Sequence, residues 1–157
     1  MPRAKHYWLM KSEPYVYSIQ DLAKDKNKTT CWDGVRNYQA RNMMRDKMKK
    51  GDLVLYYHSN AKPPGVAGVA KIVQESYPDH TQFDKKSKYY DPKATNEEPR
   101  WFMVDIQLVK IFKNFLPLED LKALKALDGM ELIRKGSRLS VQPVTKKQYE
   151  TIVKLGG

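Results

Sequence analysis

Four stretches of this chain are apolar at successive or alternating positions, a pattern typical of β-strands. They span residues 6–11, 52–58, 65–73 and 101–112. Alternation in the fourth places Val104 and Ile106 on one face and Asp105 on the other. We therefore expect four main strands, the fourth being the longest, and a short last strand over 138–141 that Pro143 ends.

Capping residues and apolar spacing predict four helices around these strands. They run from Ser18 to near Ala23, over 38–48 behind the N-cap Asn37, from Pro117 toward Asp128, and from the Thr145/Gln148 capping box through Leu155. In the second helix Ala40, Met44 and Met48 share an inward arc. Residues 24–29 form an exposed polar loop, and 74–100 a long loop that we expect to be ordered and functional.

This mixture of strands and helices indicates an α+β fold, a compact barrel flanked by helices. The 157 residues fit one domain, over 1–157, that needs no disulfide or metal to fold. Gly68, inside a strand, indicates a bulge or a close backbone approach.

The formal net charge is +11, and residues 1–50 carry 12 Lys and Arg against 5 Asp and Glu. Such a basic surface suits a polyanionic partner, because phosphates attract Lys and Arg and release counterions on binding. Charge alone also fits a merely basic protein. No apolar run approaches the roughly 20 residues of a membrane span, and the N-terminus lacks a secretory segment, so we expect an intracellular protein.

Neither a metal site nor a catalytic motif is apparent. His6, His58 and His80 are scattered, and Cys31 is the single cysteine, which favours a structural thiol in a reducing compartment. We therefore expect no cofactor, no metal and no membrane partner.

The stretch 30–48 combines an aromatic side chain, a turn and a cationic helix. Trp32 precedes Asp33-Gly34, a dipeptide that favours a turn. The polar arc of the helix that follows holds Tyr38, Arg41, Asn42, Arg45 and Lys49. We interpret this stretch as the binding element. The simpler alternative is that Trp32 is a core residue and that the arginines form a solvated helix face.

Several blocks, in this order, resemble the EVE domain family of the PUA-like superfamily, which is related to YTH and ASCH domains. They are YWLMKSEP at 7–14, CWDGVRNYQARN at 31–42, YYHSN at 56–60, YPDHTQFD at 77–84, YYDPK at 89–93, PRWFMVDIQLV at 99–109 and RLSVQPVT at 138–145. The resemblance implies a pseudo-β-barrel of about five to six strands. It also implies a non-enzymatic nucleic-acid-binding role, the recognition of a modified base such as 5-methylcytosine or N6-methyladenine. The implied location is the nucleus in a eukaryote and the cytoplasm in a bacterium.

By similarity to YTH domains, Trp32 is expected to stack on the methylated base. Candidates for the second aromatic wall are Phe83, Tyr89, Tyr90 and Trp101. Candidates for reading the polar edge are Ser12, Glu13, Asn37, His58 and Ser59, and Tyr57 belongs either to the pocket or to the core. Candidates for phosphate contacts are Lys11, Arg36, Arg41, Arg45 and Lys62.

Two other functions stay open at this point. One is a sensor of a free modified nucleobase or nucleotide, whose binding would be nearly independent of salt. The other is a hydrolase of a modified nucleoside with Glu13 or Asp84 as base beside His58, although no assembled acid–base pair is visible. We expect a monomer with DNA or RNA as its partner.

Overall fold

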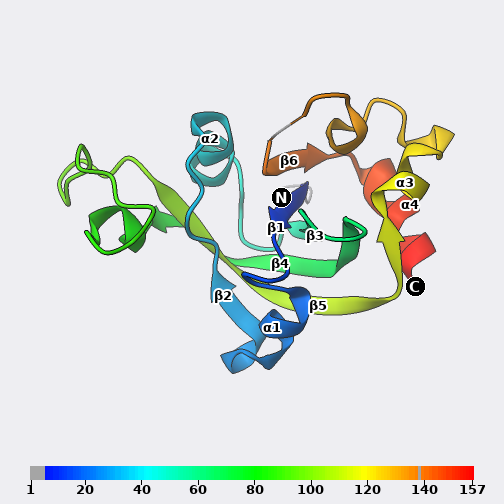
Figure 1. Ribbon diagram of the computed structural model, residues 1–157, viewed down its shortest axis with the longest axis horizontal. Coiled ribbons are helices and arrows are strands. Elements are labelled where there is room, and N and C mark those ends of the chain that lie inside the picture. Colours follow the sequence, from blue (N-terminus) through cyan, green and yellow to red (C-terminus); the bar gives the residue numbers. More distant parts are fainter. Residues whose placement is uncertain (1–5, 138) are drawn as a thin grey trace, which may run out of the picture.

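The computed structural model describes residues 6–137 and 139–157, and these form an α+β fold around one mixed, strongly curved sheet (Figure 1). The described strands are hydrogen-bonded in the order β2-β5-β4-β3-β1-β6. Their bounds are β1 Tyr7–Ser12, β2 Thr29–Cys31, β3 Leu53–His58, β4 Gly65–Pro78, β5 Phe102–Pro117 and β6 Val141–Val144. Strands β1 and β3 are parallel and the other pairs antiparallel. The sheet stays open, with β2 and β6 at its edges.

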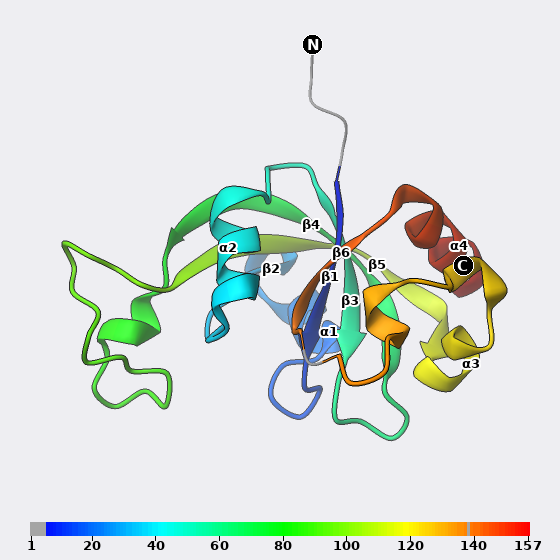
Figure 2. The same ribbon diagram turned by 90° about the horizontal axis from the view of Figure 1, so that it is seen from above.

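The central strands are buried on both faces, which explains their nearly continuous apolar sequences. Along β3, Val54 and Tyr56 face one core cluster while Leu55 and Tyr57 face the other. The first cluster packs under α1 and α2, and the second packs under α3 and α4 (Figure 2). A site on one side of the sheet can therefore include only every second side chain of β3.

The helices begin at the predicted caps. They are α1 Ile19–Lys24, α2 Tyr38–Asp46, α3 Leu118–Lys122 and α4 Lys146–Gly156, with short 3-10 turns at Lys26–Lys28, His80–Phe83, Lys125–Leu127 and Glu131–Ile133. Capping boxes at Ser18 and Thr145 are confirmed, and the Asn37 side chain accepts from the Ala40 amide. In the described ranges no helix has the length and apolar character of a membrane span.

Several predicted boundaries are wrong because pairing between strands overrides local sequence. Strand β4 continues to Pro78 against the start of β5, so the long loop begins at Asp79 rather than at residue 74. Strand β5 likewise runs on to Pro117. The segment 24–29 was expected to be a loop, but Thr29 opens the three-residue edge strand β2.

The last strand is also displaced from its prediction. It spans Val141–Val144 and contains Pro143, which was expected to end it. An edge strand tolerates proline because one side of its backbone needs no ladder partner. Arg138, the predicted start, lies outside the described residues.

The close approach predicted at Gly68 is confirmed. A Cβ there would lie 2.3 Å from the Lys110 carbonyl oxygen and 2.5 Å from the Ile19 Cδ1. Strand β4 also shifts register between Val66 and Gly68. The contacts are with the protein's own chain, so this glycine serves packing.

Candidate functional site

A cavity of about 750 Å³ opens where the end of β1, the turn after β2, the β3–β4 loop and the long loop meet. Its volume lies in the range of small-molecule binding sites, roughly 300–1,000 Å³. Its lining comprises Lys11, Ser12, Glu13, Val16, Tyr17, Thr30, Cys31, Trp32, Asp33, Gly34, Val35, Arg36, Ser59, Asn60, Lys88, Tyr89 and Ser140. Seven of these residues, from Thr30 to Arg36, are consecutive.

Trp32 is fixed in place at one wall of the cavity. Its amide donates to the Val104 carbonyl at 2.8 Å, which continues the β2–β5 pairing by one residue. Its ring meets Tyr56 edge-on, with centroids 5.4 Å apart. Because Trp32 is only 8% exposed, most of the indole is core and a limited part faces the cavity.

A buried carboxylate holds the turn that follows Trp32. Asp79 is fully buried and accepts from the Gly34 amide at 2.7 Å, from the Thr81 amide at 2.8 Å and from the Thr81 hydroxyl. Burial on its own would raise the pKa of Asp79, but these hydrogen bonds and the one from Arg36 bring that pKa below its usual value. Asp79 therefore acts as an internal anion that ties the long loop to the turn.

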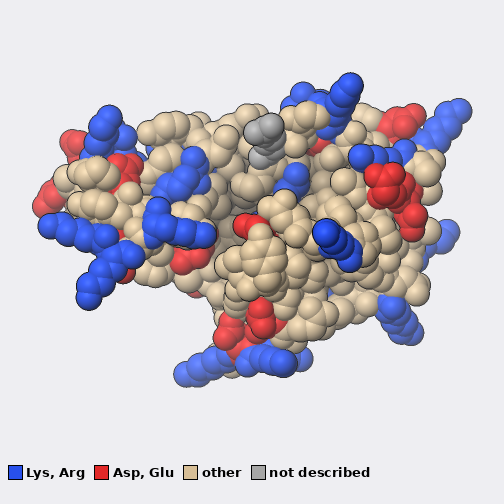
Figure 3. Space-filling model, in the orientation of Figure 1, with Lys and Arg blue, Asp and Glu red and all other residues tan. Residues whose placement is uncertain are grey.

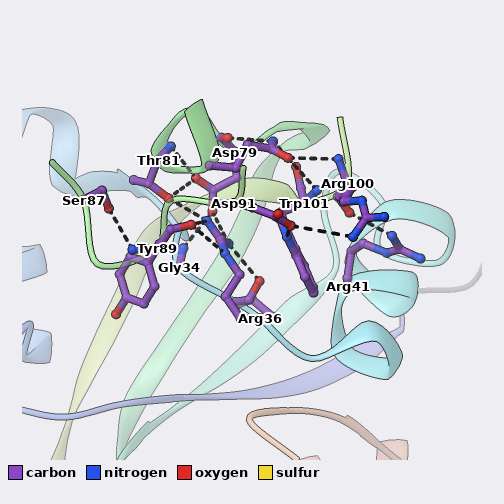
Figure 4. A network of polar contacts seen from close by, with 12 residues as sticks. Gly34, Arg36, Arg41, Asp79, Thr81, Ser87, Tyr89, Asp91, Arg100 and Trp101 are labelled. Atoms are coloured by element: carbon purple, nitrogen blue, oxygen red, sulfur yellow. Dashed lines mark hydrogen bonds and ion pairs between the residues drawn. The ribbon is translucent and has the colours of Figure 1, made fainter. Parts of the chain in front are cut away.

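Arg36 completes the same network (Figure 4). It donates to Asp79 at 3.1 Å, to the Thr81 hydroxyl at 3.0 Å, to the Val35 carbonyl at 3.0 Å and twice to the Tyr89 carbonyl at 2.8 and 3.1 Å. A guanidinium has five N–H donors, so all of them are in use. Arg36 was predicted to contact phosphate; its donors instead hold the long loop against the turn.

The loop thus brings Tyr89 to the cavity. The ring of Tyr89 lies against Gly34, where a Cβ would be 2.7 Å from the ring atoms. Gly34 also has φ of +80°, a conformation that glycine adopts without steric penalty. Of the four candidates for a second aromatic wall, the structure places Tyr89 in the lining together with Trp32.

The other three aromatic candidates do not line the cavity. Trp101 is 6% exposed, stacks on Tyr38 with centroids 4.8 Å apart, and donates its indole N–H to Asp91 at 2.8 Å. Phe83 ends the His80–Phe83 turn, and Tyr90 lies exposed on the long loop.

The polar candidates divide into two groups. Ser12, Glu13 and Ser59 line the cavity, but the Ser12 hydroxyl donates to the Tyr17 carbonyl at 2.8 Å. The Glu13 carboxylate accepts from Asn60 at 3.0 Å and from the Tyr15 hydroxyl. These bonds fix the rim of the cavity and use the one donor of the Ser12 hydroxyl, whose oxygen can still accept.

Three further candidates lie away from the cavity. Asn37 caps α2, and Tyr57 packs in the cluster on the other face of the sheet. His58 is buried, and its Nε2 accepts from the Ile19 amide at 3.1 Å. Burial lowers the pKa of His58, so the neutral ring is favoured.

The cationic candidates border the cavity or the helix beside it. Lys11 lines the cavity half-buried, and this burial lowers its pKa. Arg41 donates to the Arg100 carbonyl at 2.8 Å and lies over the Tyr38 ring, while Arg45 pairs with Asp46. Lys62 is exposed on the β3–β4 loop. Figure 3 shows Lys and Arg side chains over α2 and the long loop, with acidic side chains between them.

Several residues that shape this site were not singled out as site residues from the sequence. Asp79 and Gln82 are fully buried, and Gln82 joins the two ends of the long loop by donating to the Asp79 and Trp101 carbonyls. Asp33 and Lys88 line the cavity. Their position in turns and loops was the available signal, but the partners of Asp79 and Gln82 lie too far along the chain to be paired from sequence.

Comparison with known proteins settles the family. The EVE domain profile matches residues 6–155. The chain belongs to the EVE domain family. Mouse thymocyte nuclear protein 1 is 48% identical, over 96% of this chain and 73% of that protein.

Solved EVE structures superpose closely. Human THYN1, crystallised in complex with 5-methylcytosine-containing DNA, is 45% identical with a TM-score of 0.92, over 97% of this chain and 98% of its own. A Pseudomonas syringae protein is 50% identical with a TM-score of 0.91, over 96% and 99%. A Zymomonas mobilis ASCH protein, at 10% identity and a TM-score of 0.53, shares the fold alone.

Proposed function

We propose that this EVE domain binds nucleic acid without catalysis and admits one modified base, such as 5-methylcytosine or N6-methyladenine, into the cavity between Trp32 and Tyr89. The observation that carries the proposal is the cavity itself, which is lined by three aromatic residues, Tyr17, Trp32 and Tyr89, and bordered by Lys11 and Lys88. The complex of human THYN1 with 5-methylcytosine-containing DNA supports it.

The base enters either flipped out of a duplex or from a single strand, because a stacked base cannot reach an enclosed pocket. Lys11, Arg41, Arg45 and Lys62 supply the phosphate contacts, which give affinity with little sequence information. Arg36 contributes indirectly, by holding Tyr89 in the wall. The hydrolase alternative gains no support, since the His58 Nε2 already accepts from Ile19.

The test compares binding of single-stranded oligonucleotides that carry one 5-methylcytosine or one cytosine, at about 50 and 200 mM salt, by fluorescence anisotropy. We expect the methyl group to strengthen binding about 4-fold, from about 0.8 kcal/mol of transfer free energy. Affinity should fall with salt by a slope of about −0.7 for each phosphate neutralised.

Free 5-methyl-2′-deoxycytidine serves as the competitor in the same assay. If the nucleoside binds as tightly as the oligonucleotide and its binding is indifferent to salt, the protein is a sensor of free nucleosides. If methylated and unmethylated strands bind equally, the modified-base proposal is rejected.

A further inference from the structure

Asp33 is a cavity residue whose side chain lacks a partner from another residue. It lies between Trp32 and Gly34 in the turn that lines the cavity. Across residues 6–137 and 139–157, no hydrogen bond or ion pair reaches its carboxyl group from another side chain or amide. Asp79, by contrast, accepts from both Gly34 and Arg36. Asp79 is thus saturated by donors from other residues, whereas Asp33 accepts only from its own backbone amide and keeps lone pairs for a further donor.

The surroundings of Asp33 favour an added donor. Although the residue is exposed overall, partial desolvation raises the pKa of its carboxyl group, and the negative charge of Asp79 raises it further. His80, the hydrogen bond from the backbone amide of Asp33 itself, and Arg36 oppose this shift. A carboxylate that is partly desolvated beside a like charge is stabilised by any N–H group that a ligand brings to it.

Two other polar side chains of the lining already have partners within the protein. Glu13, the other acidic residue in the lining, already accepts from Asn60 and Tyr15. The Ser12 hydroxyl donates to Tyr17. A base that packs against Trp32 would present its edge to the residues beside the indole, and Asp33 is the next residue in the chain.

Building on the function proposed above, we propose that Asp33 selects bases that carry an exocyclic amino group, by accepting a hydrogen bond from that group. Cytosine and adenine present an amine on the edge used for base pairing, whereas thymine and uracil present a carbonyl oxygen at the same place. A carboxylate attracts the amine and repels the carbonyl oxygen. The cavity therefore accepts 5-methylcytosine and rejects thymine, although both carry the 5-methyl group.

The test uses single-stranded oligonucleotides that are identical except for one central 5-methylcytosine, thymine or cytosine. Wild-type protein should bind the 5-methylcytosine strand about 5- to 150-fold more tightly than the thymine strand. Asp33→Asn should lose most of this preference, because an amide both donates and accepts and so matches the thymine edge as well.

Asp128→Asn is the matched control. It makes the same change of charge at an exposed position after the Lys125–Leu127 turn, outside the cavity lining. It should leave the preference for 5-methylcytosine over thymine unchanged. The thermal unfolding midpoint of each variant verifies folding, and Asp33 has no partner in another residue that the substitution would disrupt.

The outcomes separate the two proposals. If wild type prefers 5-methylcytosine over cytosine but does not distinguish it from thymine, or if Asp33→Asn keeps the wild-type preference, the role of Asp33 is rejected while modified-base binding stands. If wild type distinguishes none of the three strands, both proposals fail.

Discussion

Replacement of Arg36 by methionine is expected to lower the free energy of unfolding by about 3–5 kcal/mol. The substitution leaves Asp79, whose side chain is fully buried, without its cationic partner. It also removes two donors from the Tyr89 carbonyl. Methionine retains much of the side-chain length, so the effect reports on lost polar contacts more than on a lost volume. Urea denaturation followed by circular dichroism measures it.

Arg45→Met is the matched control for this prediction. Arg45 pairs with Asp46 at 2.8 Å, but both side chains are exposed. An exposed pair contributes about 0–1 kcal/mol, so the control should unfold close to wild type. Equal stability of the two variants would show that the Arg36 network does not hold the long loop.

Replacement of Trp32 by alanine is expected to weaken binding of a methylated strand by about 5- to 150-fold, the equivalent of about 1–3 kcal/mol for a stacked base. The lower part of this range is expected because only 8% of the residue is exposed. The same substitution should cost about 3–5 kcal/mol of stability, since it removes a large side chain from the core. Binding is therefore measured at a temperature where the variant remains folded.

Two further variants separate stacking from folding. Trp32→Phe keeps an aromatic ring at the cavity and should retain more affinity than the alanine variant. Trp8→Ala removes an indole that is 3% exposed in the same core cluster but absent from the cavity lining. It should lose comparable stability and no affinity for the methylated strand. If Trp8→Ala and Trp32→Ala reduce affinity equally, the binding defect arises from destabilisation alone.

Helix caps and the buried face of α2 could be predicted because they depend on residues only a few positions apart in the sequence. The caps at Ser18, Asn37 and Thr145 need only residues three positions away. The inward arc of α2 was likewise predictable from spacing, and Ala40 and Met44 are indeed fully buried.

Strand extents depended on distant partners. Residues 74–78 look polar and irregular, yet they pair with the start of β5 through register shifts. Strand β2 has three residues, too few for a periodic pattern. In the sequence, Pro143 indicates the end of a strand. It is tolerated inside β6 because that strand lies at an edge of the sheet, which the sequence does not reveal.

The cavity lining could be predicted only in part, because some of its residues are placed by partners that are distant in the sequence. Trp32, Ser12, Glu13 and Ser59 do reach the cavity, as does Tyr89, but sequence could not choose Tyr89 among the aromatics of the long loop. That choice follows from the hydrogen bonds between Arg36 and the Tyr89 carbonyl, 53 positions apart. The Tyr57 side chain points away from the cavity, into the core cluster on the other face of the sheet, because side chains alternate along β3.

The most direct test of the central claim is a ¹H–¹⁵N NMR titration that follows the indole N–H signals of the three tryptophans. Trp101 donates its indole N–H to Asp91 and lies beside the lining residue Arg36. Trp8 donates its indole N–H to Asp52 and is absent from the lining, so it serves as the internal reference. A strand with one 5-methylcytosine should shift the Trp32 signal more than the matched cytosine strand does, and should leave Trp8 unchanged. If the α2 amides shift alike with both strands while the Trp32 signal stays in place, nucleic acid binds only at the basic surface and the cavity does not admit the base.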